Sequence, residues 1–243
     1  MPYANVNDTR LYYKETGTGE PLVFVHGGWS DHSVWGQVVP TLSGSHRVIA
    51  YDRRSHGRSE RVRGVLPRRR HEDDLAGLLE ALELAPAHVV GTSYGASTAL
   101  GLAARRPELF RSVVAHEPPL LEIVGDDPVA RAALAQTETS LRTVIERVEA
   151  GDLAGGAEQF VEEVALGPGM WAQLPEQMRA MMVHNAPAIV DEQRDPDWAG
   201  VDAARLAQTG VPVLLTQGDQ SPAWFAQIVA RLGDTVAESR VTT

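Results

Sequence analysis

The stretch Ala87-His-Val-Val-Gly-Thr-Ser-Tyr-Gly-Ala96 decides the fold of this chain. The short apolar run at Val89 and Val90 predicts a buried strand, and the alanine- and leucine-rich pattern from Ala96 onward predicts a helix. Between them, Ser93 stands at the apex of a tight turn with a glycine two residues to either side. Side chains at those glycines would collide with the neighbouring strand and helix, so we expect a nucleophile elbow rather than a glycine-rich turn around a buried serine.

Composition limits what the rest of the chain can be. With 243 residues, 43% of them hydrophobic, the chain fits one α/β domain, with room for an inserted subdomain. The absence of cysteine excludes disulfides, thiolate metal sites and a cysteine nucleophile, and fits a reducing compartment. The start of the sequence is not typical of a signal peptide, and no apolar run approaches the roughly 18 residues of a membrane span, so we expect a cytoplasmic protein.

Charge argues against two kinds of partner. The net charge of −10 disfavours nucleic acid and anionic membranes. Five arginines depart from this pattern because they crowd one predicted loop: Arg61, Arg63, Arg68, Arg69 and Arg70. We expect this loop to be solvated rather than to bind a ligand.

Buried strands and helices alternate along most of the chain. The pattern predicts an edge hairpin over 3–15, buried strands at 21–25, 47–51, 111–115 and 211–215, and the start of another strand at 237–242. Helices are predicted from 33 to 42, over 71–84, from 96 onward and over 224–232. The fold class is therefore α/β, with a mostly parallel sheet and helices on both faces.

The alternation stops in the middle of the chain. Residues 130–150, 157–166 and 174–184 read as helices with no strand pattern between them. We expect residues 120–206 to form a helical cap inserted into a core made of 1–119 and 207–243. Two alternatives stay open for its apolar side chains, which either line a pocket or form the core of the cap: Met170, Trp171, Met178, Met181 and Met182.

Polar and glycine-rich segments follow several predicted strands. His26-Gly27-Gly28-Trp29 ends the strand at 21–25, and its backbone N–H groups, that of Gly28 first, are candidate oxyanion donors. Asp52 opens an arginine-rich segment that we expect to be held together by charged hydrogen bonds. Asp219 follows the strand at 211–215, which places a carboxylate at the same sheet edge as Ser93.

These segments, taken in order, resemble the α/β-hydrolase superfamily of esterases, epoxide hydrolases and haloperoxidase-like serine hydrolases. The matching pieces are His26–Trp29, Asp52–Ser59, Gly91–Gly95, His116–Pro119 and Gln217–Asp219. The resemblance implies that Ser93 is the nucleophile, that the N–H groups of Gly28 and Tyr94 form the oxyanion hole, and that Asp219 is the acid, with Glu117 as the alternative. It also implies a substrate pocket, for which the candidates are Trp29, Glu117, Met181 and His184.

Three departures from the family pattern bear on function. A serine nucleophile argues against the epoxide hydrolases and haloalkane dehalogenases, which use a carboxylate there. Ser55 replaces a usual glycine, for which we expect a small local effect. The family order is serine, acid, histidine, yet no histidine follows His184.

Three interpretations of that last departure remain open. The chain resembles a hydrolase cut off before its catalytic histidine and last helix. Alternatively, one of four other histidines replaces it: His26, His32, His116 or His184. In the third interpretation, the protein is a non-catalytic relative that binds a small apolar ligand under the cap. A missing last helix would bare part of the sheet, so we also expect self-association, and hence a possible homo-oligomer.

The expected activity is hydrolysis of a small, apolar carboxylic ester through an acyl-enzyme, without metal or organic cofactor. The only partner expected besides a second copy is the small-molecule substrate. The sequence leaves open which substrate this is, because ester, thioester, lactone, amide and carbon–carbon hydrolysis share these residues.

Overall fold

An eight-stranded sheet forms the centre of the computed structural model, which describes residues 2–243 apart from the side chains of Val129 and Ala133. The strands are β1 (Tyr3–Val6), β2 (Thr9–Thr16), β3 (Glu20–Val25), β4 (His46–Tyr51), β5 (Ala87–Thr92), β6 (Phe110–His116), β7 (Val213–Thr216) and β8 (Ser239–Thr242). They lie in the order β1-β2-β4-β3-β5-β6-β7-β8. Only the pairs β1–β2 and β2–β4 are antiparallel, so the predicted edge hairpin and mostly parallel sheet are confirmed.

Helices and single helical turns connect the strands. They are η1 (His32–Trp35), α1 (Val39–Leu42), α2 (Arg68–Ala81), α3 (Tyr94–Arg105), η2 (Pro107–Leu109), η3 (Leu121–Val124), α4 (Pro128–Glu149), α5 (Leu153–Gln159), the π-helix η4 (Phe160–Ala165), η5 (Trp171–Gln173), α6 (Glu176–Gln193), α7 (Ala203–Ala207) and α8 (Ala223–Thr235). None of those within the described residues is both long and apolar enough to cross a bilayer.

Several helices differ from the sequence prediction. The helix predicted over 33–42 consists of two separate short pieces, η1 and α1. Helix α2 begins at Arg68 rather than at residue 71, because the Arg68 backbone N–H donates to the Asp195 carboxylate, 2.8 Å away, and fixes the first turn. Helix α6 continues to Gln193 rather than ending at 184, with Pro187 inside it. A proline inside a helix removes one hydrogen bond and normally predicts an end, so the extension reflects the burial of the last turns, which include Ile189 and Val190.

The two faces of the sheet are covered unequally. The largest apolar cluster joins one face to α2, α3, α7 and α8, and includes Val113, Ala115 and Leu215. On the other face a smaller cluster packs β3 and β4 against η1 and α1. Because side chains alternate along a strand, Val114 and Leu214 point to this second face, where they are half-buried. The expected self-association through a bared sheet stays a prediction.

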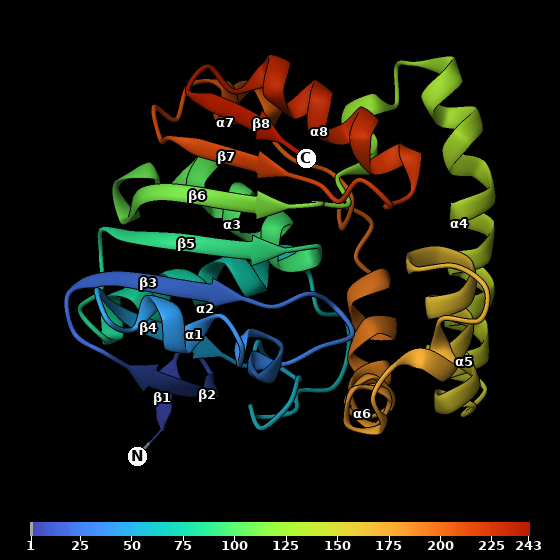
Figure 1. The fold of residues 1–243 in the computed structure, drawn as a ribbon, viewed down its shortest axis with the longest axis horizontal. Helices are drawn as coiled ribbons and strands as arrows, with labels where there is room; N and C mark the ends of the chain where they lie inside the picture. Colours follow the sequence, from blue (N-terminus) through green and yellow to red (C-terminus); the bar gives the residue numbers. More distant parts are fainter. Residues whose placement is uncertain (1) are drawn as a thin grey trace.

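Helices α4, α5 and α6 stand beyond the carboxyl ends of the central strands, to which the strand arrows point in Figure 1. They have an apolar cluster of their own, which also takes in Trp29 from the turn after β3. The consequence is that the sheet edge carrying the elbow faces this helical segment.

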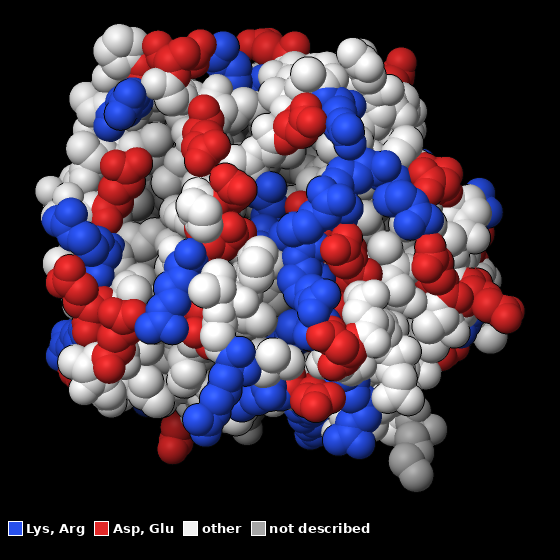
Figure 2. Space-filling view, turned by 180° about the vertical axis from the view of Figure 1, so that it is seen from behind, with Lys and Arg blue, Asp and Glu red and all other residues white. Residues whose placement is uncertain are grey.

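The predicted arginine loop is only partly a loop. Figure 2 shows Lys and Arg side chains gathered on the back of the molecule and interleaved with acidic ones. Arg69 and Arg70 belong to α2 and pair with Asp73 and Asp8 at 3.6 and 2.7 Å. Arg68 is buried, where it pairs with Glu72 at 3.1 Å, so its placement in a solvated loop was wrong.

Candidate active site

The serine turn has the strained geometry that its glycines predict. Ser93 has φ of 51° and ψ of −125°, between the end of β5 and the start of α3. A methyl group on Gly91 would lie 2.5 Å from the Gly95 carbonyl oxygen, and one on Gly95 would lie 2.3 Å from that of Val25. The Ser93 backbone N–H donates to the carbonyl of His116 at 2.8 Å, which holds the turn against β6. Within the described residues, the Ser93 hydroxyl has no hydrogen-bond partner, and it is therefore free to meet a ligand.

Ser93 lines a cavity of about 330 Å³ between the sheet edge and the helical segment. Met178, Met181 and Met182 reach it from α6. Met170 and Trp171 pack into the apolar cluster of the helices without lining the cavity, whereas Met181 and Met182 belong to both, so the two alternatives are not exclusive. Of the other predicted pocket residues, Trp29 and Glu117 line the cavity.

His184 does not line this cavity. Its ring is exposed, and its Nε2 lies 3.2 Å from the Gly57 carbonyl oxygen. Each residue turns a helix by roughly 100°, which puts His184 about 140° away from the row formed by Met178, Met182 and Ile189. The expectation of a pocket residue at 184 is therefore corrected by the rotation of α6.

Two backbone N–H groups beside Ser93 have no protein acceptor among the described residues, namely those of Gly28 and Tyr94. The Gly27 carbonyl accepts from Arg53 Nη2 at 3.1 Å and lies 2.7 Å from His26 Nδ1. In a trans peptide the N–H points opposite to the carbonyl, so Arg53 and His26 turn the Gly28 N–H away from themselves. Both free donors belong to residues that line the cavity, as an oxyanion hole requires.

A buried carboxylate, Glu192 of α6, also lines the cavity. Its Oε1 forms an ion pair with Arg53 Nη1, where the two side chains are 2% and 0% exposed, and lies 3.0 Å from His71 Nε2. Burial alone would raise the pKa of Glu192, but Arg53, His56 and His71 outweigh it and lower that pKa to about 2. Sequence reasoning missed Glu192 because no motif marks it. The signal was its position on the helix face that carries Met178 and Met182.

The buried histidines near this ion pair predict an acid-sensitive fold. Burial, with Arg53 adding to it, lowers the pKa of His56 from an ordinary 6.5 to about 3 and that of His26 well below 6.5. Below about pH 6.5 the unfolded chain binds protons that the folded chain does not. The contribution of these two histidines to the free energy of unfolding is thus at its full value above pH 6.5. It falls toward pH 3, by up to about 1.4 kcal/mol per pH unit for each group.

Urea unfolding followed from about pH 7.5 to about pH 4.5 checks this prediction. His56→Gln should flatten the pH dependence, whereas His184→Gln, at an exposed ring, should leave it unchanged. Equal slopes for His56→Gln and the parent chain would contradict it.

None of the eight histidines lines the Ser93 cavity in the described residues. Each of the four considered as a substitute base is held by other groups: His26 by Gly27 and Arg53, His32 by Asp52, His116 by Thr216 and His184 by Gly57. The structure therefore brings no histidine to the Ser93 hydroxyl.

The two candidate acids differ in position. Glu117 has φ of 49°, lines the cavity and accepts a hydrogen bond at Oε1 from the Gly218 N–H at 2.8 Å. Asp219 follows β7 at the same sheet edge, but it is exposed and does not line the cavity. The arrangement thus places Glu117, rather than Asp219, in the same cavity as Ser93.

The arginine-rich segment after β4 is held by Asp52, as predicted. Asp52 Oδ1 accepts from His32 at 2.6 Å, and its Oδ2 accepts from the Arg58 N–H at 2.8 Å. Asp31, His32 and Asp52 also bring three potential metal-ligand atoms within 4.8 Å of one another, but both oxygens of Asp52 are already used by protein donors. Ser55 adopts the φ of 65° that favours glycine, and its hydroxyl bonds to Val62, which agrees with a local effect.

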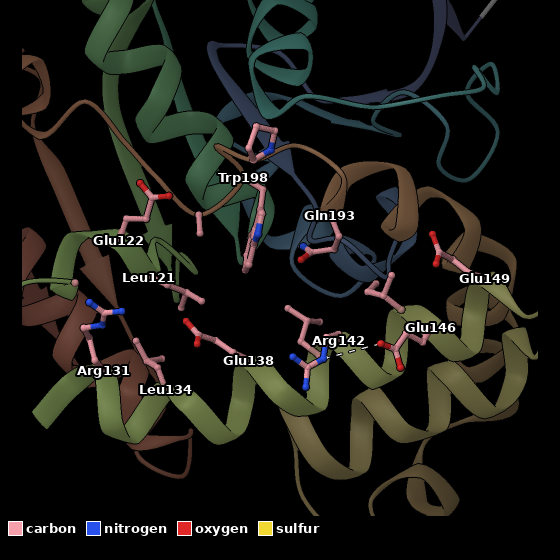
Figure 3. Close-up of a pocket in the computed structure, with 15 residues that line it drawn as sticks. Leu121, Glu122, Arg131, Leu134, Glu138, Arg142, Glu146, Glu149, Gln193 and Trp198 are labelled. Atoms are coloured by element: carbon pink, nitrogen blue, oxygen red, sulfur yellow. Dashed lines mark ion pairs between the residues drawn. The ribbon is translucent and has the colours of Figure 1, made fainter. Parts of the chain in front are cut away.

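A second cavity, of about 710 Å³, lies between α4 and the segment after α6 (Figure 3). In Figure 3, Trp198 projects toward α4, whose Glu138, Arg142 and Glu146 form the opposite side. The two cavities share four lining residues, so they adjoin: Leu121, Leu141, Gln193 and Trp198.

Comparison with known proteins places the fold in a family. The model of the alpha/beta hydrolase family matches residues 22–241. The hydrolase YraK of Bacillus subtilis, which is uncharacterized, is 33% identical over 129 residues, which are 52% of this chain and about half (48%) of YraK. The putative carbamate hydrolase RutD of Azorhizobium caulinodans is 28% identical over 249 residues, covering 99% of this chain and 88% of RutD.

The same similarity extends to solved structures. An alpha/beta hydrolase from Sphaerobacter thermophilus superposes with a TM-score of 0.79 at 25% identity, covering 98% of this chain and 90% of the other. The overall fold of the chain thus has a match in the solved structure of an alpha/beta hydrolase.

Proposed function

The chain belongs to the alpha/beta hydrolase family, and we propose that within it this protein is a serine hydrolase, a carboxylesterase for small, largely apolar esters. One observation carries the proposal. The hydroxyl of Ser93, on a strained turn, is unpartnered among the described residues and lies in a cavity beside two free backbone N–H groups. Strain of this kind is characteristic of functional sites.

In the proposed reaction, Ser93 Oγ attacks the ester carbonyl carbon and forms a tetrahedral intermediate. The N–H groups of Gly28 and Tyr94 stabilise the negative oxygen, and loss of the alcohol leaves an acyl-enzyme that water hydrolyses. The Ser93 proton must pass to a base, and Glu117 is the carboxylate proposed for this role. Its side chain lines the cavity, and the carbonyl of the preceding residue, His116, accepts the Ser93 N–H.

The lining of the cavity supports the proposed substrate class. The cavity volume of about 330 Å³ suits a small molecule, and Trp29, Met178, Met181 and Trp224 give it mostly apolar walls. We propose that residues 120–206 act as the cap that closes this cavity, with α6 supplying its inner surface. The related protein RutD is named a putative carbamate hydrolase, which supports acyl chemistry of this general kind.

A fluorophosphonate probe tests the proposal, because it reacts much faster with an activated serine than with an ordinary one. We expect covalent labelling that peptide mapping assigns to Ser93. The alternative is a non-catalytic relative that binds a small apolar ligand in the same cavity, whose walls are mostly apolar. Absence of labelling at Ser93 would support that alternative.

The positions of Glu117 and Asp219 predict which of the two carboxylates activates the Ser93 hydroxyl. Glu117→Gln should slow fluorophosphonate labelling by about 100-fold or more, as loss of a general base does, whereas Asp219→Asn, at an exposed side chain, should change it less than twofold. The rates are measured under pseudo-first-order conditions. A loss confined to Asp219→Asn would instead favour the acid implied by the family resemblance.

A further inference from the structure

Glu192 uses only one of its two carboxylate oxygens in the fold. Oε1 takes the polar contacts that this side chain makes with the core, from Arg53, His71 and, at 3.8 Å, His56. No protein donor of the described residues lies within hydrogen-bonding distance of Oε2. Glu192 lines the Ser93 cavity, so its second oxygen is left to accept a hydrogen bond from a molecule bound there.

The free oxygen lies next to the proposed oxyanion hole. A methyl group placed on Gly28 would be 3.6 Å from Glu192 Oε2, and one on Gly27 would be 3.3 Å from Ser93 Cβ. The glycine pair therefore separates the nucleophile from this oxygen. A carbonyl group held at the Gly28 N–H would carry its nearest substituents toward Glu192.

We propose that Glu192 determines substrate specificity by accepting, at Oε2, a hydrogen bond from a hydroxyl or N–H group next to the reacting carbonyl. The preferred substrates are then acyl compounds with such a donor on the atom beside the carbonyl carbon, α-hydroxy esters among them. An ionised carboxylate only accepts hydrogen bonds, so a donor is bound and an aliphatic group of the same size is not. The inference rests on the proposed function only in placing the carbonyl at Gly28.

Two ketones that an esterase does not cleave test the inference. 1-Hydroxyhexan-2-one and heptan-3-one differ only by a hydroxyl in place of a methyl group beside the carbonyl. Trp29, Trp198 and Trp224 line the cavity, so quenching of tryptophan fluorescence reports binding. We expect the hydroxyketone to bind about tenfold more tightly, as a hydrogen bond to a charged group allows.

Glu192→Gln should weaken this preference, because a hydrogen bond between the hydroxyl and a neutral amide is weaker than one to a carboxylate. The glutamine oxygen must face the Arg53 donors, which leaves an NH₂ donor toward the cavity. Glu192→Asp keeps the charge but withdraws the carboxylate by one methylene, and it should weaken the preference as well, so the test survives if one variant does not fold. Glu176→Gln, exposed on the same helix, is the matched control and should keep the preference.

Equal affinities of the parent chain for the two ketones, or a preference unchanged in both Glu192 variants, would overturn the inference. Its failure is distinct from that of the proposed function. Fluorophosphonate labelling of Ser93 without a hydroxyl preference would overturn the role of Glu192 alone, and a hydroxyl preference without labelling would overturn the esterase alone.

Discussion

Ser93→Ala is expected to lower kcat/KM for a short p-nitrophenyl ester by roughly 10³-fold or more, to the level of general binding and oxyanion stabilisation. The hydroxyl oxygen is the only non-hydrogen atom removed, and it is the atom proposed to attack. The measurement is release of p-nitrophenol by the chain and by the variant at matched concentration. Indistinguishable rates would mean that the chain as it stands does not act through Ser93.

Ser97→Ala is the matched control for that substitution. Ser97 lies one turn further along α3, is fully buried, and its hydroxyl has no partner among the described residues. Since the hydroxyl is unpaired, its removal is expected to leave both turnover and stability nearly unchanged. A loss of activity in this variant would show that substitutions in α3 act through folding rather than through the nucleophile.

Arg53→Met should destabilise the fold by about 3–5 kcal/mol, because it leaves the buried Glu192 carboxylate without its main counter-charge. It also removes one of the two groups that hold the Gly27 carbonyl, so the Gly28 N–H is held less firmly and Ser93 labelling should slow. Urea unfolding at neutral pH, followed by tryptophan fluorescence, measures the stability change.

Two further variants identify the cause. Arg69→Met, on the exposed side of α2, should cost no more than about 1 kcal/mol because its pair with Asp73 is solvated. The double variant Arg53→Met/Glu192→Leu should recover most of the lost stability, since two apolar side chains replace a buried pair of charges. If the double variant were as unstable as the sum of both single variants, the ion pair would not be the source of the effect.

The elbow and the sheet could be predicted from sequence because both depend on local constraints. Gly91 and Gly95 are required where a side chain would lie within 2.5 Å of backbone atoms, and this requirement is visible in the spacing around Ser93. The continuous apolar strands alternate with helices, which predicts a parallel sheet whose carboxyl ends meet at one edge. Gly28 follows as an oxyanion candidate because its glycine pair comes soon after the strand that ends at Val25, and the family resemblance implies Tyr94 as the second donor.

Only the tertiary structure decided which side chains face the serine. Glu192 meets Arg53 across 139 residues of sequence, and His184 points outward, although both lie on the same helix. The rotation of α6 about its axis directs Glu192 toward the core and His184 toward the outside. That rotation is set by packing against the turn after β3. Glu117 lines the cavity while Asp219 does not, although both follow strands at the same edge. Local pattern places a residue at an edge or on a helix, but the contact it makes depends on packing between segments that are remote in sequence.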